Sequence, residues 1–134
     1  MRSIARSVHL ALAWLLVAGL VVQVFLAGLG VFRGPGSFAT HRDFGYLLEA
    51  LPFFLLIFGL ISRLGRRAAL LAAGIFGLFL LQSILVVVRS SAPEVAALHP
   101  VNGFLITFLA IVLARDAWLA RGADADATEA TATT

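Results

Sequence analysis

The chain has 134 residues, of which 61% are apolar and only 13% are charged. Soluble domains carry about a quarter charged residues, so this composition excludes an ordinary soluble domain and predicts an integral membrane protein. The absence of cysteine excludes disulfides, thiolate metal sites and cysteine nucleophiles. The small net charge of +3 comes from loop flanks and forms no basic stripe that would indicate nucleic-acid binding.

Four apolar runs are long enough to cross the hydrocarbon core, which takes roughly 20 helical residues. In chain order they cover about residues 7–32, 41–62, 67–88 and 99–120. Breakers and charges fill the connections RGPGSFAT, SRLGRR and RSSAPEVAALH. We therefore expect an all-α, integral membrane four-helix bundle of up-down-up-down topology in one domain, residues 1–121. The tail, residues 122–134, has no large apolar residue and is predicted to be disordered.

Arginine placement predicts the orientation, because cytoplasmic flanks carry an excess of basic residues. Three arginines fall on one side, namely Arg33, Arg42 and Arg89, and seven fall on the other, namely Arg2, Arg6, Arg63, Arg66, Arg67, Arg115 and Arg121. We expect a multi-pass protein of the inner cell membrane with both termini in the cytoplasm. A secretory signal is the alternative for the first run, but that run is longer than a signal core of about 7–15 residues.

Two histidines recur in one five-residue frame, HRDFG from His41 and HPVNG from His99, 58 positions apart. The same shift places Gly45 on Gly103, and a shift one residue longer places Gln23 on Gln82. The repeat raises the hypothesis of a duplicated helical hairpin. Chance agreement in a sequence rich in Leu, Ala and Gly is the alternative.

Polar residues inside the spans are costly in lipid and therefore informative. Gln23, Gln82, Glu49 and Thr107 all fall in the predicted outer half; Glu49, for example, lies eight residues after His41, roughly 12 Å of helix. The null hypothesis is that amide, hydroxyl and carboxyl groups hold helices together. Glu49 is then a protonated or hydrogen-bonded structural group, with Gln23, Gln82 or Tyr46 as partner, and its functional alternative is a proton relay.

The histidine frames fit one kind of cofactor. In an up-down-up-down bundle the second and fourth helices are parallel and diagonally opposed, so His41 and His99 would face one another near the outer surface. Two imidazoles from facing helices can ligate a haem iron, and Gly45 and Gly103, one turn after each ligand, would leave a slot for the porphyrin. Arg33, Arg42 and Arg89 would meet the propionates, with Gln23, Gln82 and Glu49 in the same polar layer.

The segments VQVFLAGLGVF, HRDFGYLLEALP and LHPVNGFLITFLAIVLARDAW resemble a family of short, uncharacterised bacterial four-helix membrane proteins. The histidine arrangement is also similar to that of membrane b-type cytochromes built on four-helix bundles. The second resemblance implies one haem b per chain with His41 and His99 as iron ligands. The pattern of four histidines that marks two-haem members is absent, and His9 is expected to be an interfacial residue at the cytoplasmic end.

The leading functional hypothesis is thus a small b-type cytochrome that transfers electrons with a quinone or a periplasmic redox protein. A cofactor-free accessory or assembly subunit of a larger membrane complex is the main alternative, and a channel or transporter is a third. The partners expected are the lipid bilayer and, for the alternative, further copies or other subunits. The sequence shows no nucleophilic triad, phosphate loop or three-ligand zinc set, so any enzymatic role is at most a quinone-linked redox one.

Overall fold

The computed structural model describes the backbone of residues 2–132 and the side chains of residues 3–122. Within these residues the chain is all-α, as predicted, and has four long helices and three short helical segments. The elements are α1 (Arg2–Arg33), η1 (Pro35–Ser37), α2 (Phe38–Ile61), α3 (Arg66–Val87), η2 (Val88–Ser90), α4 (Pro93–Ala96) and α5 (His99–Ala132). All four long helices are long and apolar enough to cross a membrane.

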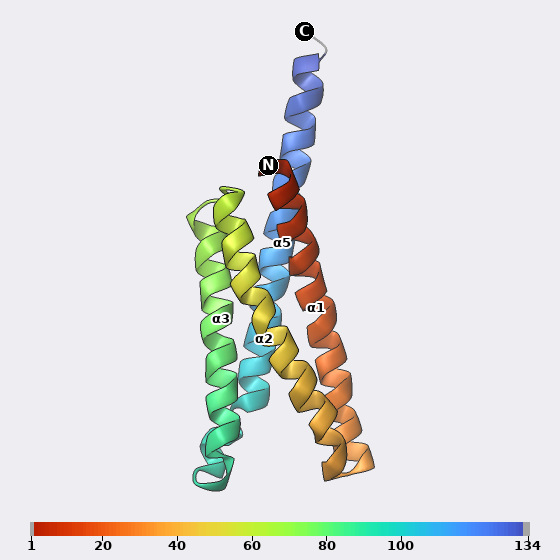
Figure 1. Ribbon diagram of the computed structural model, residues 1–134, viewed down its shortest axis with the longest axis vertical. Helices are drawn as coiled ribbons and strands as arrows, with labels where there is room; N and C mark the ends of the chain where they lie inside the picture. Colours follow the sequence, from red (N-terminus) through yellow and green to blue (C-terminus); the bar gives the residue numbers. More distant parts are fainter. Residues whose placement is uncertain (1, 133–134) are drawn as a thin grey trace.

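The four long helices alternate in direction along the bundle (Figure 1). α1 packs against α2 and α5, and α3 packs against the same two helices. α2 and α5 are therefore diagonal partners, as the short connections predict. We call the end of the bundle that carries η1, η2 and α4 the histidine end, and the end that carries the α2–α3 loop the terminal end.

Each long helix contributes a fully buried side chain to one continuous core. Leu16, Leu55, Ile75 and Ile106 come from α1, α2, α3 and α5 in that order, and each is at most 1% exposed. Alanines of α3 and α5 lie between them and let the backbones approach closely. The outward faces are also apolar, since Phe32 is 90% exposed, which is what a helix surrounded by lipid requires.

Several helix ends differ from the sequence prediction. α2 begins at Phe38, directly after η1, which is three residues before the predicted start at residue 41. Near this start Arg42 pairs with Asp43 at 2.8 Å. α5 runs to Ala132, and in Figure 1 it extends past the bundle. Alanine, frequent in this segment, has the highest intrinsic helix propensity.

The α2–α3 loop closes the terminal end of the bundle. Gly65 has a φ of +90°, a conformation that costs glycine little, and α3 begins at the next residue. Ser62 is fully buried, and its hydroxyl donates a hydrogen bond to the Phe58 carbonyl at 2.5 Å. The Ser62 carbonyl accepts a bond from Arg6 at 3.4 Å, which ties the loop to α1.

Candidate functional site

The structure brings the two repeated histidines together. The ring centroids of His41 and His99 lie 6.1 Å apart with an angle of 67° between the ring planes. The rings come from the diagonal helices α2 and α5, at the histidine end. The two residues are 58 positions apart in the sequence, so their contact results from the packing of the two hairpins against each other.

His41 is held by a reciprocal pair of bonds to α1. The Gln23 side-chain amide donates to the His41 backbone carbonyl at 2.8 Å, and Nδ1 of His41 lies 3.1 Å from the Gln23 backbone carbonyl. A carbonyl oxygen only accepts, so Nδ1 must carry the hydrogen of this bond. In the neutral ring Nε2 then carries no hydrogen and has a free lone pair. A histidine nitrogen in this form can bind a metal or accept a proton.

His99 is held in a different way, by two amide side chains. Asn102 donates to the Gln82 side-chain oxygen at 2.6 Å and to the Leu78 backbone carbonyl at 2.9 Å. The Gln82 amide nitrogen is thereby directed at Nε2 of His99, 3.2 Å away. Nδ1 of His99 is buried without a hydrogen-bond partner among the described residues.

Asn102 is part of the HPVNG frame but was not predicted as a site residue. It lies three positions after His99, on the same face of α5, and is only 7% exposed. An amide within a long apolar run is the signal in the sequence that could have identified it as a candidate. Its two bonds tie α5 to α3 and fix the Gln82 amide beside the histidine.

The glycines of the two frames lie against the glutamines. A Cβ at Gly45 would come 2.7 Å from the Gln23 amide nitrogen, and one at Gly103 would come 3.5 Å from the Gln82 amide nitrogen. The space beside both glycines, assigned by the sequence analysis to a porphyrin, therefore contains amide groups. A flat macrocycle could enter only if these amides moved aside.

Glu49 has a different partner from the ones predicted. The Ser83 hydroxyl of α3 donates to its carboxyl oxygen at 3.4 Å, where Gln23, Gln82 or Tyr46 was expected. Thr107, on the corresponding face of α5, bonds the Gly103 carbonyl of its own helix at 2.8 Å. Glu49 thus links α2 to α3, and Thr107 forms no such link between helices.

The three arginines predicted for propionates lie at the histidine end but bond locally. Arg42 pairs with Asp43, and Arg89 donates to the Val86 carbonyl at 3.0 Å. Arg33 is the last residue of α1 and is exposed. These positions leave guanidinium groups at the rim of the bundle, outside the histidine pair itself.

His9 is the largest departure from the sequence prediction, which made it interfacial. Its side chain is 0% exposed, and Nδ1 lies 3.0 Å from the Leu55 carbonyl of α2. Gly59 makes room for the ring, since a Cβ there would come 3.3 Å from the His9 Cε1 atom. The prediction was wrong because it placed His9 by depth alone, and depth does not say which side of α1 faces the core.

A model of a family of unknown function, DUF6220, matches residues 23–90. The match runs from Gln23 through α2 and α3 to the end of η2, so it includes His41, Glu49 and Gln82 and ends before α5. No curated protein and no solved structure is similar enough to match this chain.

Proposed function

The chain belongs to the DUF6220 family, whose function is unknown, and we propose that it is a small membrane electron-transfer protein. The protein would hold one b-type haem between His41 and His99. Its electron partner would be a quinone or a redox protein. In this proposal the histidine end faces outward from the inner membrane and both termini face the cytoplasm.

The separation of the two rings is the observation that carries the proposal. Two imidazoles can reach one metal ion only when their rings lie close together, because each metal–nitrogen bond is about 2 Å long. The centroids of His41 and His99 are 6.1 Å apart. When bound, the haem iron would supply a one-electron couple within the membrane.

The surrounding residues fit this role in part. The bond from Nδ1 of His41 to the Gln23 carbonyl fixes the tautomer that leaves Nε2 free for iron. His99 has an unpartnered buried Nδ1, while its Nε2 faces the Gln82 amide. Nε2 of His99 could therefore bind iron only if the Gln82 side chain rotated away, which would break the bond between the Gln82 amide and Nε2.

Absorption spectroscopy tests the proposal directly. The protein is expressed with ample haem, purified, and measured before and after dithionite. Two imidazole ligands give low-spin iron, so we expect sharp α and β bands from one haem per chain in the reduced protein. His41→Ala and His99→Ala should each lose the haem or convert it to high spin, while His9→Phe, at the other end of the bundle, should keep the spectrum.

The variant Gln82→Ala separates this proposal from the accessory-subunit alternative. If iron must compete with the Gln82 amide for His99, the variant should bind haem at least as tightly as the parent protein. One observation favours the accessory-subunit alternative. The glutamine, histidine and asparagine groups form hydrogen bonds with one another, as polar groups that only hold helices together do. A colourless wild-type protein, together with a destabilised Gln82→Ala variant, would reject the haem and support the accessory role.

A further inference from the structure

A hollow of about 180 Å³ lies at the terminal end of the bundle, where α1, the α2–α3 loop and α5 meet. Its polar lining consists of two arginines and two serines, Arg6, Arg121, Ser3 and Ser7. Its apolar lining consists of Leu64, Ala117 and Ala120. No acid is among the lining side chains that the structure describes, so the lining of this hollow, the basic hollow, is positively charged.

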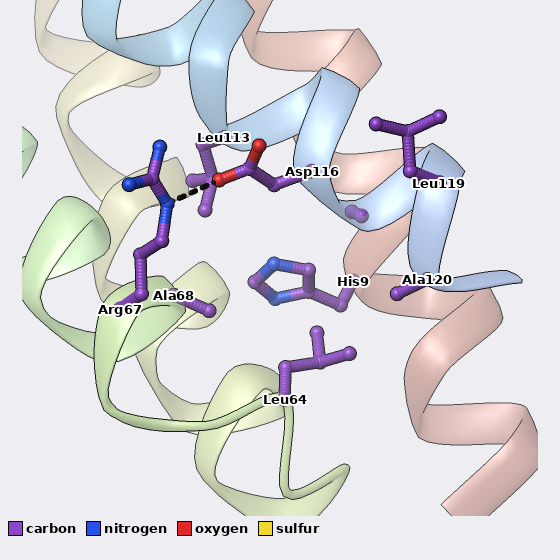
Figure 2. A pocket seen from close by; sticks show the side chains of 9 residues that line it. His9, Leu64, Arg67, Ala68, Leu113, Asp116, Leu119 and Ala120 are labelled. Atoms are coloured by element: carbon purple, nitrogen blue, oxygen red, sulfur yellow. Dashed lines mark hydrogen bonds and ion pairs between the residues drawn. The ribbon is translucent and has the colours of Figure 1, made fainter. Parts of the chain in front are cut away.

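The adjoining hollow differs from the basic hollow in its charge. It has a volume of about 270 Å³ and shares the apolar residues Leu64, Ala117 and Ala120 with the basic hollow. Figure 2 shows Arg67 and Asp116 on its polar side, where they form an ion pair of 2.7 Å. These two charges compensate each other. Neither ion pair between described side chains involves Arg121, which is exposed.

The donors of the basic hollow are arranged on neighbouring elements. Arg6 is half-buried, and its Nε donates to the Ser62 carbonyl of the loop at 3.4 Å. A guanidinium group has several N–H donors, so Arg6 can hold the loop and contact an anion at the same time. Ser3 and Ser7 are four positions apart and lie on one face of α1, and each hydroxyl can donate one further bond.

The net charge of the chain is concentrated at the terminal end. In the sequence, its seven arginines are accompanied by four acids, Asp116, Asp124, Asp126 and Glu129. The three arginines of the histidine end are balanced by three acids, Asp43, Glu49 and Glu94. The net charge of +3 therefore belongs to the terminal end, which attracts anions more strongly than the histidine end does.

The basic hollow lies at the depth of lipid headgroups. The candidate membrane span of α1 begins at Ser3, and that of α5 ends at Gly122, so Arg6 and Arg121 lie within a turn of these limits. Trp118 of α5 is 59% exposed, and tryptophan is typical of the membrane–water interface. Basic residues at this depth attract anionic lipids.

We propose that the basic hollow binds the phosphate group of an anionic phospholipid, held by Arg6, Arg121 and the two serine hydroxyls. Arginine suits this ligand because its planar group can bind phosphate bidentately. The lipid's glycerol would lie on Ala117 and Ala120. The volume is below the range of about 300–1,000 Å³ usual for whole small molecules, so it suits a headgroup whose acyl chains remain in the bilayer. The site lies at the opposite end of the bundle from the histidine pair and does not depend on haem.

The test compares phosphatidylglycerol with phosphatidylcholine, whose choline compensates the phosphate charge. Each lipid is titrated onto the full chain in an uncharged detergent, and bound lipids are counted by native mass spectrometry. We expect one phosphatidylglycerol per chain to bind about tenfold more tightly than phosphatidylcholine. The difference should shrink as salt is added, because salt screens exposed charges.

Variants of two arginines on α5 separate a local site from a diffuse excess of charge. Arg121→Gln should weaken phosphatidylglycerol binding about fivefold, the effect of one basic residue near a membrane surface, and Arg121→Lys should restore most of it. Arg115→Gln removes the same charge from an exposed position that does not line the hollow, so it should keep the affinity of the parent protein. The melting temperature of each variant in the same detergent checks that the fold is intact.

Inorganic phosphate distinguishes the two sources of the anion. At equal ionic strength it should displace phosphatidylglycerol no better than chloride does, because it lacks the apolar part that lies on the alanines. Displacement by inorganic phosphate alone would overturn the lipid assignment. Equal affinity for the two lipids, or equal losses in Arg115→Gln and Arg121→Gln, would overturn the site itself. These measurements need no haem, so their outcome is independent of the absorption spectrum that tests the electron-transfer proposal.

Discussion

Gly45 and Gly103 occupy equivalent places in two similar frames but meet their neighbours at different distances. The would-be Cβ of Gly45 lies 2.7 Å from the Gln23 amide nitrogen, inside any normal contact, while that of Gly103 lies at 3.5 Å from Gln82, an ordinary contact. Only the first glycine is therefore required for the bond that holds its histidine, since the Gln23 amide that donates to the His41 carbonyl needs that space.

Alanine scanning of the two glycines should reveal this difference. Gly103→Ala should stabilise the protein by about 0.5–1 kcal/mol, because alanine loses less conformational freedom in a helix than glycine does. Gly45→Ala should give no such gain, because Gln23 must move and surrender its hydrogen bond. Denaturation of both variants in detergent measures the difference.

The background Gln23→Ala supplies the control for that comparison. Without the glutamine side chain, Gly45→Ala should become as favourable as Gly103→Ala, and the coupling between positions 23 and 45 is the measured quantity. Equal effects of the two glycine substitutions in the parent protein would contradict the assignment of Gly45 to Gln23.

Between elements, the bond from Ser83 to Glu49 links α2 to α3 within the span. It measures 3.4 Å, and the serine is the donor, so the carboxyl oxygen needs only to accept. An amide oxygen can accept in the same way. The contact therefore does not require a charge at Glu49, and a charge would be costly at this depth in lipid.

Substitutions at Glu49 should follow from this geometry. Glu49→Gln should leave the free energy of unfolding and any haem content nearly unchanged, because the acceptor for Ser83 is retained. Glu49→Ala and Ser83→Ala should each destabilise by about 0.6–1 kcal/mol, the usual worth of a hydrogen bond between membrane helices. Equal, severe unfolding of Glu49→Gln and Glu49→Ala would instead indicate an ionised and paired carboxylate.

For the molecule as a whole, both polar regions lie close to opposite ends of an otherwise apolar bundle. His41 lies near the start of α2 and His99 at the start of α5, close to the α1–α2 and α3–α5 connections, whereas His9 lies beside Leu64 of the α2–α3 loop. The orientation of the bundle therefore decides which region lies nearer the cytoplasm. The arginine distribution predicts that the terminal end, which contains His9, faces the cytoplasm.

Reporter fusions test this orientation. Fusions at Arg66 and after the last residue should both report the cytoplasm, and a fusion near Gly36 should report the outside. The seven arginines near one end and the three near the other supply the physical reason. A cytoplasmic signal at Gly36 would place the histidine pair on the inner side and remove a periplasmic protein from its candidate partners.

The sequence predicts four helices long and apolar enough to cross a membrane, because each is a long apolar run with charges and breakers at its ends. It also indicates the meeting of His41 with His99, since the order of short connections makes α2 and α5 diagonal. In each hairpin a glutamine contacts the histidine that follows it, Gln23 with His41 and Gln82 with His99, but the bonds differ, and α4 lengthens only the second connection.

The contacts of Asn102, Ser83 and His9 could not be predicted in the same way. Each depends on how far its helix is rotated about its own axis. In a soluble helix the apolar stripe reveals that rotation, but a helix that is apolar on all sides carries no such stripe. The burial of His9 and the partner of Glu49 therefore required the packed structure.

α5 is the last of the four long helices to be synthesised, and it contributes to both polar regions. His99 and Asn102 contribute to the histidine pair, while Leu113 and Asp116 lie around His9 at the terminal end of the bundle. During translation the first three helices can enter the membrane and pack before either site exists. A premature stop codon ahead of Pro93 would therefore remove the α5 side of both regions at once while leaving three of the four long apolar helices.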